Sequence, residues 1–289
     1  MTLSSDHKAL KESGYIFQRD SEHFTVRLRI PGGELTSEQL ISVGELAREW
    51  GRGEVHLTTR QGIEIPWIKF ESLGEITRTL DENGMSPGSC GPRVRNISSC
   101  VGLPRCVNAN CDTWGLAERI DGRFFNVTLP TKLKIAISGC PNSCTKSQVN
   151  DVGVIAVVRP RIIPERCDGC GVCIRACREA AIKIEEELAE IDFSRCANCG
   201  DCIRACPEGA SVADHEGYSV FVGGNVGRHP RLAIKLVDFA DEETVMAVLE
   251  NSIRLISEEG ERKERFGHLI ERLGVGEATR RLLRGTPRY

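Results

Sequence analysis

Two neighbouring stretches of the chain share one cysteine spacing. Residues 167–177 read Cys167-Asp-Gly-Cys170-Gly-Val-Cys173-Ile-Arg-Ala-Cys177, and residues 196–207 read Cys196-Ala-Asn-Cys199-Gly-Asp-Cys202-Ile-Arg-Ala-Cys206-Pro207. Thiolates are soft ligands that suit iron–sulfur clusters, and this spacing is typical of two-cluster ferredoxins. The spacing therefore predicts a small bacterial-ferredoxin-like domain that holds two [4Fe-4S] clusters.

In such pairs of runs, the fourth cysteine of each run binds the cluster of the other run. One cluster is therefore predicted to have the ligands Cys167, Cys170, Cys173 and Cys206. The other cluster is predicted to have the ligands Cys196, Cys199, Cys202 and Cys177. Zinc would not need four cysteines per run, and disulfides belong to secreted chains, whereas the N-terminal residues show no secretory signal.

The length of the chain suggests two domains, and its composition gives no reason to expect a strongly charged partner. The chain has 289 residues and a net charge of −3, so nothing in its overall charge favours nucleic acid or a membrane surface. Aromatic residues make up only 5%, which also argues against base stacking. No apolar stretch is long enough to span a bilayer. We expect a cytoplasmic protein, without a membrane span and without a nucleic-acid partner.

The first part of the chain alternates short strands with helices. Residues 24–30 alternate apolar and polar side chains, which indicates a strand with one buried face. Thr36 with Gln39, and Ser72 with Glu75, are two possible capping boxes, predicted to open helices that end near Trp50 and near residues 83–84. Residues 55–58 and 63–68 fit two further strands. This order predicts an open α+β sheet in residues 1–85.

The rest of the chain is predicted to form a second domain that the cysteine-rich module interrupts. A helix is expected at residues 107–120, strands at 133–137 and 152–158, and a short helix after residue 144. Arg159-Pro160 marks an expected boundary, and a strand resumes at 218–222. Further predictions are a strand at 232–237, helices at 242–257 and 262–273, and a loose tail from Glu277. The predicted domains are therefore 86–159 with 214–289, and the module at 160–213.

Several segments together resemble the siroheme-containing sulfite and nitrite reductases, in particular the dissimilatory or anaerobic sulfite reductase type. The matching segments are residues 26–33, Leu57-Thr58-Thr59-Arg60-Gln61, Arg95-Asn96-Ile97, Cys100-Val-Gly-Leu-Pro-Arg-Cys106, residues 129–134, Ser138-Gly139-Cys140-Pro141-Asn142-Ser143-Cys144 and Gly223-Gly224-Asn225. The resemblance covers roughly residues 15–158 and 215–240. It implies that residues 1–85 form the family's ferredoxin-like half-domain and that the second domain is a siroheme-binding α/β domain.

The resemblance also implies the cofactors and their ligands. Cys100, Cys106, Cys140 and Cys144 are implied to bind a third [4Fe-4S] cluster, with Cys144 bridging it to the siroheme iron. Other implied siroheme contacts are Arg27, Arg29, Thr59, Gln61 and Asn142. Arg60, Arg95, Lys132 and Lys134 are implied to form the family's anion-binding cluster. Independently, Lys132 and Lys134 are spaced to point to one face of a strand, where they would offer compact positive charge to an oxyanion.

Simpler interpretations stay open for most of these residues. A Lys-x-Lys pair on a strand is commonly a solvated face, and Arg60 and Arg95 alone would be ordinary surface residues. Cys100 and Cys106 could be buried thiols, which is the interpretation adopted for the two remaining cysteines, Cys90 and Cys111. The glycine-rich turn at 223–227 lacks the spacing of a nucleotide-binding loop, which excludes a nicotinamide or flavin site.

The expected activity is the six-electron reduction of sulfite to sulfide, with electrons delivered through the ferredoxin module by a donor protein, either a ferredoxin or a flavoprotein/Fe-S subunit. Nitrite reduction to ammonia uses the same cofactors and is the alternative. An electron-transfer subunit without active siroheme, and a redox-sensing or scaffold protein, are the other classes. Because many relatives contain two related halves, we expect a homodimer or a pairing with a related subunit.

Overall fold

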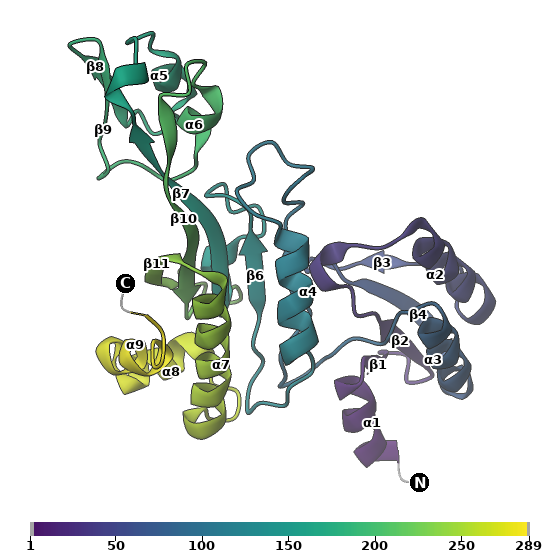
Figure 1. The fold of residues 1–289 in the computed structure, drawn as a ribbon. Coiled ribbons are helices and arrows are strands. Elements are labelled where there is room, and N and C mark those ends of the chain that lie inside the picture. The colour runs from purple at the N-terminus through teal and green to yellow at the C-terminus, as the bar shows by residue number, and fades with distance from the viewer. Residues whose placement is uncertain (1–2, 288–289) are drawn as a thin grey trace.

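The computed structural model describes residues 3–287 and divides them into two lobes and a projecting module (Figure 1). The first lobe has a four-stranded antiparallel sheet in the order β1-β2-β4-β3. Its elements are α1 (Leu3–Glu12), β1 (Tyr15–Phe17), β2 (His23–Arg27), α2 (Ser37–Trp50), β3 (His56–Leu57), β4 (Ile63–Lys69) and α3 (Leu73–Glu82). The predicted α+β order is confirmed, with α1 and β1 added in front.

Alternation in β2 explains how the first lobe closes its core. Phe24 and Val26 point inward and are buried, while the alternate residues His23, Thr25 and Arg27 are half-buried. They pack with Ile65 and Ile68 of β4 and with the apolar faces of α2 and α3. The predicted capping box of α2 is present: the Thr36 hydroxyl accepts from the N–H of Gln39, whose side chain bonds back to Thr36.

The second lobe has a five-stranded mixed sheet in the order β11-β10-β7-β6-β5. Its strands are β5 (Ser98–Ser99), β6 (Ile135–Ser138), β7 (Val152–Ile162), β10 (Ser211–Val222) and β11 (Ile234–Ala240). The helices α4 (Thr113–Phe124), α7 (Glu242–Glu259), α8 (Phe266–Leu273) and α9 (Val275–Leu282) pack on it. β5, β6 and β7 are parallel, so the carboxyl ends of β5 and β6 place Cys100 and Cys140 side by side.

The cysteine-rich module stands at the tip of a long two-stranded ribbon formed by β7 and β10 (Figure 1). It contains two one-turn helices, α5 (Val172–Ala176) and α6 (Asp201–Ala205), and the hairpin β8 (Ile182–Glu185) and β9 (Leu188–Ile191). β7 passes through Arg159-Pro160 without a break, and Pro160 pairs with Ala213. The expected limits of the module at 160 and 213 therefore fall inside the ribbon rather than between elements.

Four expectations about individual elements were wrong. Ser72 makes no side-chain cap, so the second predicted capping box is absent, although α3 begins at Leu73. The predicted helix at 107–120 begins at Thr113, because Asp112 caps it by accepting from the N–H of Gly115. A single 3₁₀ turn, Ser147–Val149, replaces the short helix expected after residue 144. The tail from Glu277 is helical, since α9 buries Ala278 and Leu282 against the second core.

No helix within residues 3–287 combines the length and the apolar character needed to cross a membrane.

Candidate functional site

A cavity of about 200 Å³ lies between the two lobes and concentrates positive charge. Polar side chains from both lobes form its wall. The lining residues are Arg27, Leu28, Thr58, Thr59, Arg60, Gly62, Gly88, Ser89, Arg95, Asn96, Lys132 and Lys134. All four predicted anion-binding residues, together with Arg27 and Thr59 of the predicted siroheme contacts, therefore line one cavity.

Lys132 and Lys134 line the cavity because the backbone between them is extended. Leu133, between them, points the other way and is fully buried in the second core. The backbone N–H of Arg95 donates to the carbonyl of Leu133 at 2.9 Å, which brings Arg95 beside the two lysines. Burial, followed by the charges of Arg60 and Lys132, lowers the pKa of Lys134 to about 8, and burial also lowers the pKa of Lys132.

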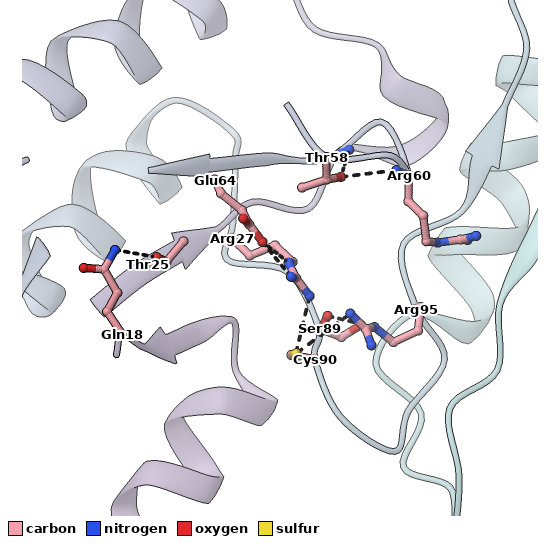
Figure 2. Close-up of polar contacts among 10 residues, drawn as sticks. Gln18, Thr25, Arg27, Thr58, Arg60, Glu64, Ser89, Cys90 and Arg95 are labelled. Atoms are coloured by element: carbon pink, nitrogen blue, oxygen red, sulfur yellow. Dashed lines mark hydrogen bonds and ion pairs between the residues drawn. The ribbon is translucent and has the colours of Figure 1, made fainter. Parts of the chain in front are cut away.

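Arg60 reaches across the interface of the two lobes and is held by the protein. Its Nη1 donates to Oδ1 of Asn150 at 2.7 Å, and its Nη2 donates to the carbonyl oxygens of Asn96 and Ile135 at 2.9 and 3.0 Å. Figure 2 shows its side chain directed away from Arg27 and Arg95. Burial lowers the pKa of Arg60 to about 10. Nε is buried with no hydrogen-bond partner among residues 3–287.

Two further arginines meet at a buried cysteine (Figure 2). Nη1 of Arg27 lies 3.4 Å from Sγ of Cys90, while Arg27 Nε donates to Glu64 at 2.8 Å. Nε of Arg95 donates to the carbonyl of Ser89 at 3.1 Å. The expectation of a plain buried thiol at Cys90 holds for its burial, but this thiol also faces two guanidinium groups.

Arg29, Gln61 and Asn142, three of the predicted siroheme contacts, do not line this cavity, and neither does Cys144. Nε of Arg29 donates to the buried Asp121 at 2.6 Å, and its guanidinium stacks on Phe125. The amide of Gln61 pairs with both backbone groups of Ser99, so it holds β5 just before Cys100. Asn142 is exposed on the loop between Cys140 and Cys144. Arg29 and Gln61 thus make structural contacts here.

A buried ion pair behind the lysines was not predicted from the sequence. Asp151 is fully buried, and both its carboxylate oxygens accept from Nη2 of Arg265, at 2.7 and 2.8 Å. Asp151 also accepts from the backbone N–H of Lys134 at 2.9 Å, so it fixes the strand that carries this lysine. No spacing relates Arg265 to residues 132–151, and only the fold brings them together.

The loops that carry the third predicted cluster set meet at the ends of β5 and β6. Sγ of Cys100 accepts from the backbone N–H of Gly139 at 3.1 Å. Burial raises the pKa of the Cys140 thiol, and the proximity of Cys100, Cys144 and Cys106 adds to this shift. Such a gathering of thiols, with an amide directed at sulfur, fits an iron–sulfur cluster.

The fifth cysteine of this region, Cys111, is also close to the set. Burial and the neighbouring Cys100 raise the pKa of its thiol to about 12, and it shares a hydrogen bond with Tyr218. The high pKa agrees with a neutral thiol, although Cys111 is half-buried rather than buried as expected.

In the module, one cavity has on its wall the four cysteines that were assigned to a single cluster. Cys167, Cys170 and Cys173 of the first run line it together with Cys206 of the second run. Sγ of Cys206 accepts from the N–H of Ala210, and Sγ of Cys177 accepts equivalently from Ala181, at 3.2 and 3.3 Å. The repeated amide-to-sulfur contacts fit cluster thiolates in both runs.

No group of three or more His, Cys, Asp or Glu side chains in the described part of the chain is gathered as a single metal ion would need. A four-iron cluster binds each thiolate to a different iron atom, so its ligands lie farther apart than those of one ion.

Comparison with known families assigns both lobes. Residues 16–83 match the nitrite/sulfite reductase ferredoxin-like half domain, and residues 90–285 match the nitrite and sulphite reductase 4Fe-4S domain. The chain belongs to the nitrite and sulfite reductase family. Its class is therefore that of the iron–sulfur oxidoreductases, and siroheme is the cofactor expected of the family.

Individual relatives of the chain include sulfite reductases and nitrite reductases. The chain is 36% identical over 266 residues to the coenzyme F420-dependent sulfite reductase of Methanocaldococcus jannaschii, covering 91% of this chain but only 43% of that protein. It is 31% identical over 305 residues to one subunit of the anaerobic sulfite reductase of Salmonella typhimurium, covering 96% of this chain and 88% of that subunit. The structure of dissimilatory sulfite reductase I matches with a TM-score of 0.77 at 23% identity, covering 93% and 73%, which supports the fold.

Proposed function

We propose that this protein is a siroheme-dependent reductase that carries out the six-electron reduction of sulfite to sulfide. The observation that supports it best is the cavity between the lobes, where five basic side chains line a small volume. Sulfite is a small dianion, so its binding calls for compact positive charge at one point. When bound, siroheme supplies an iron atom through which electrons reach the oxyanion.

The basic residues divide into two roles. Lys132, Lys134 and Arg95 bind the anion, and the two ammonium groups donate protons where oxygen leaves as water. Arg60 positions the cavity wall, because its Nη atoms are already bonded to the second lobe. Arg27, Thr59 and the exposed Asn142 are proposed to contact siroheme, while Arg29 and Gln61 support the surrounding loops.

Electrons are proposed to enter through the module. Residues 160–213 would hold two [4Fe-4S] clusters on the two swapped cysteine sets, and Cys100, Cys106, Cys140 and Cys144 would hold the third, with Cys144 as the siroheme bridge. Cys144 is the exposed member of that set, which is consistent with a ligand that faces a further cofactor. The donor is proposed to be a ferredoxin or a flavoprotein/Fe-S subunit.

A dimer, with itself or with a related subunit, is proposed to complete the site. Apolar side chains are exposed beside the Cys100–Cys106 turn: Val101, Leu103, Val107 and Trp114. A cluster of exposed apolar side chains rimmed by polar residues marks an association surface. Light scattering of the holoprotein should give twice the mass of the chain, or the mass of a heteromer; a monomer with full siroheme and activity contradicts this proposal.

Nitrite is the second candidate substrate, because the matched family includes nitrite reductases and the cavity selects a small oxyanion by charge. Anaerobically purified holoprotein should be assayed with sulfite and with nitrite under the same strong reductant. The proposal expects the higher kcat/KM with sulfite. A higher value with nitrite would transfer the assignment to nitrite, and turnover of neither would favour an electron-transfer subunit.

A further inference from the structure

One asparagine joins the loop of Cys140 to the loop of Cys199. Asn110 lies in the irregular segment between Cys106 and α4. Its backbone N–H donates to the carbonyl of Gly139, the residue before Cys140, at 2.7 Å. Its side-chain Nδ2 donates to the carbonyl of Cys199 at 3.3 Å. A single residue and two hydrogen bonds therefore connect a ligand of the predicted third cluster with a ligand of the module.

This connection is closely packed on the module side. Arg204 of α6 donates to Oδ1 of Asn110 and to the carbonyl of Cys199, both at 2.9 Å, and pairs with Asp201 at 2.7 Å. Gly200 has a φ of +79°, and a Cβ atom there would lie 2.6 Å from Val158 and 3.4 Å from Oδ1 of Asn110. The loop thus approaches β7 and Asn110 at a distance that only glycine allows.

The contact involves the second cysteine run alone. The backbone N–H of Val158 donates to the carbonyl of Asn198 at 2.9 Å, so the same loop is also bonded to β7. Within residues 3–287, no hydrogen bond joins residues 167–177 to residues 100–144. Cys170 of the first run is exposed. The two module clusters are therefore not equivalent with respect to the third.

We propose that Asn110 is a positioning residue that couples the module to the siroheme-side cluster, so that electrons leave through the cluster of Cys196, Cys199, Cys202 and Cys177. The inference rests on the proposed function, since it assumes that both clusters are bound. In each transfer, the module cluster is oxidised by one electron and the siroheme-side cluster is reduced by one, and no bond forms or breaks. The first-run cluster, beside exposed Cys170, then receives electrons from the donor.

The test uses Asn110→Asp in the full-length holoprotein. Aspartate keeps the shape of the side chain and an acceptor for Arg204, but it lacks the Nδ2 donor to Cys199. The variant is reduced anaerobically and mixed with excess sulfite, and the oxidation of the module clusters is followed in time. We expect iron content and the siroheme band to be unchanged, the oxidation of the module clusters to slow several-fold, and the magnetic interaction between reduced clusters to weaken in electron paramagnetic resonance.

Asn108→Asp is the matched control. It adds the same charge two residues away, and the Asn108 side chain makes no hydrogen bond within the described residues. It should transfer electrons at the unaltered rate. Arg204→Gln, which removes the guanidinium contact to Cys199, should slow the transfer in the same direction as Asn110→Asp.

Three results would overturn the inference: an Asn110→Asp protein that transfers at the original rate, equal slowing by Asn108→Asp, or an unaltered rate in Arg204→Gln. If the unmutated protein contains no siroheme or no cluster iron, the proposed function itself is contradicted, which is a different outcome. The two failures are therefore distinguished by the spectrum of the starting protein.

Discussion

The basic side chains of the cavity differ in what each can still bind. Arg60 has given its Nη donors to Asn150, Asn96 and Ile135. Within residues 3–287, neither Lys132 nor Lys134 donates a side-chain hydrogen bond to the protein, so both remain available for an anion. An arginine that is bonded across a lobe interface stabilises the shape of the cavity, whereas the lysines supply charge to its contents.

The lowered pKa of Lys134 predicts a pH dependence. The ammonium form binds the anion, and it is lost as the pH rises through about 8. The value of kcat/KM should therefore fall above this pH, because it reports the free enzyme. Lys134→Arg keeps the charge at all these pH values and should flatten the alkaline fall. Nitrite, which stays a monoanion, serves as the control for titration of sulfite itself, and an unchanged profile in Lys134→Arg would contradict the assignment.

The buried contacts of Arg60 predict a loss of stability. Arg60→Met leaves the carbonyls of Asn96 and Ile135 without their donor inside the protein. We expect the free energy of unfolding to fall by about 1–3 kcal/mol, as for other buried groups that lose a partner. Denaturant titration of the cluster-free chain measures this change. Arg78→Met, at an exposed helix site paired with Glu75 and Glu82, is the control and should leave stability unchanged.

Individual residue positions could be predicted from the sequence only where they depend on local spacing. The common face of Lys132 and Lys134 could be predicted, because it depends only on the alternation of an extended strand. The partners of Arg60 could not, since Asn150 is ninety positions away in the chain. The ion pair of Asp151 and Arg265 could not be predicted either, since only the fold brings the start of α8 beside the segment of Lys134.

Among the helices, two similar capping sequences adopt different structures. Thr36 and Ser72 both precede a helix and both have Gln or Glu three residues later. Only Thr36 adopts the extended backbone of an N-cap; Ser72 has a helical backbone because a 3₁₀ turn (Phe70–Ser72) leads directly into α3. The start of α4 was also misplaced, because Asn110 bonds to the loops of Cys140 and Cys199 instead of continuing a helix, and Asp112 caps α4.

This difference predicts unequal effects of two alanine substitutions. Thr36→Ala removes a hydroxyl that accepts from the N–H of Gln39, and it should cost about 0.5–2 kcal/mol. Ser72→Ala removes no cap and should stay within about 0.5 kcal/mol of the starting protein. Denaturant titrations of the two variants check this directly. Equal losses would show that the capping geometry of α2 does not contribute as described.

In the whole molecule, hydrogen bonds of Asn110 connect the loop before Cys140 with the second cysteine run of the module. The family could be predicted from the sequence, because it depends on motifs that lie within short segments. The swapped cysteine sets stay a prediction. The sequence did not predict the ribbon of β7 and β10 that carries the module, since Arg159-Pro160 suggested an interruption where the strand continues.

The swapped sets predict the effect of removing the last cysteine of each run. Cys206→Ala should perturb the cluster whose other ligands are Cys167, Cys170 and Cys173, with which Cys206 shares a cavity. Cys177→Ala should perturb the other cluster. Each variant should lose about four irons, since each removes one ligand of a [4Fe-4S] cluster. Electron paramagnetic resonance shows which cluster has been lost. If either variant instead lost the cluster bound by the first three cysteines of its own run, the exchange of the fourth ligands would be contradicted.

We propose that one chain combines two ferredoxin-type clusters with a third cluster coupled to siroheme. To check this, the protein should be purified without oxygen, its visible spectrum recorded and its iron counted. We expect a siroheme band and about thirteen irons per chain, from three four-iron clusters and the macrocycle. About eight irons without a siroheme band would contradict this proposal, because only the module would then be loaded.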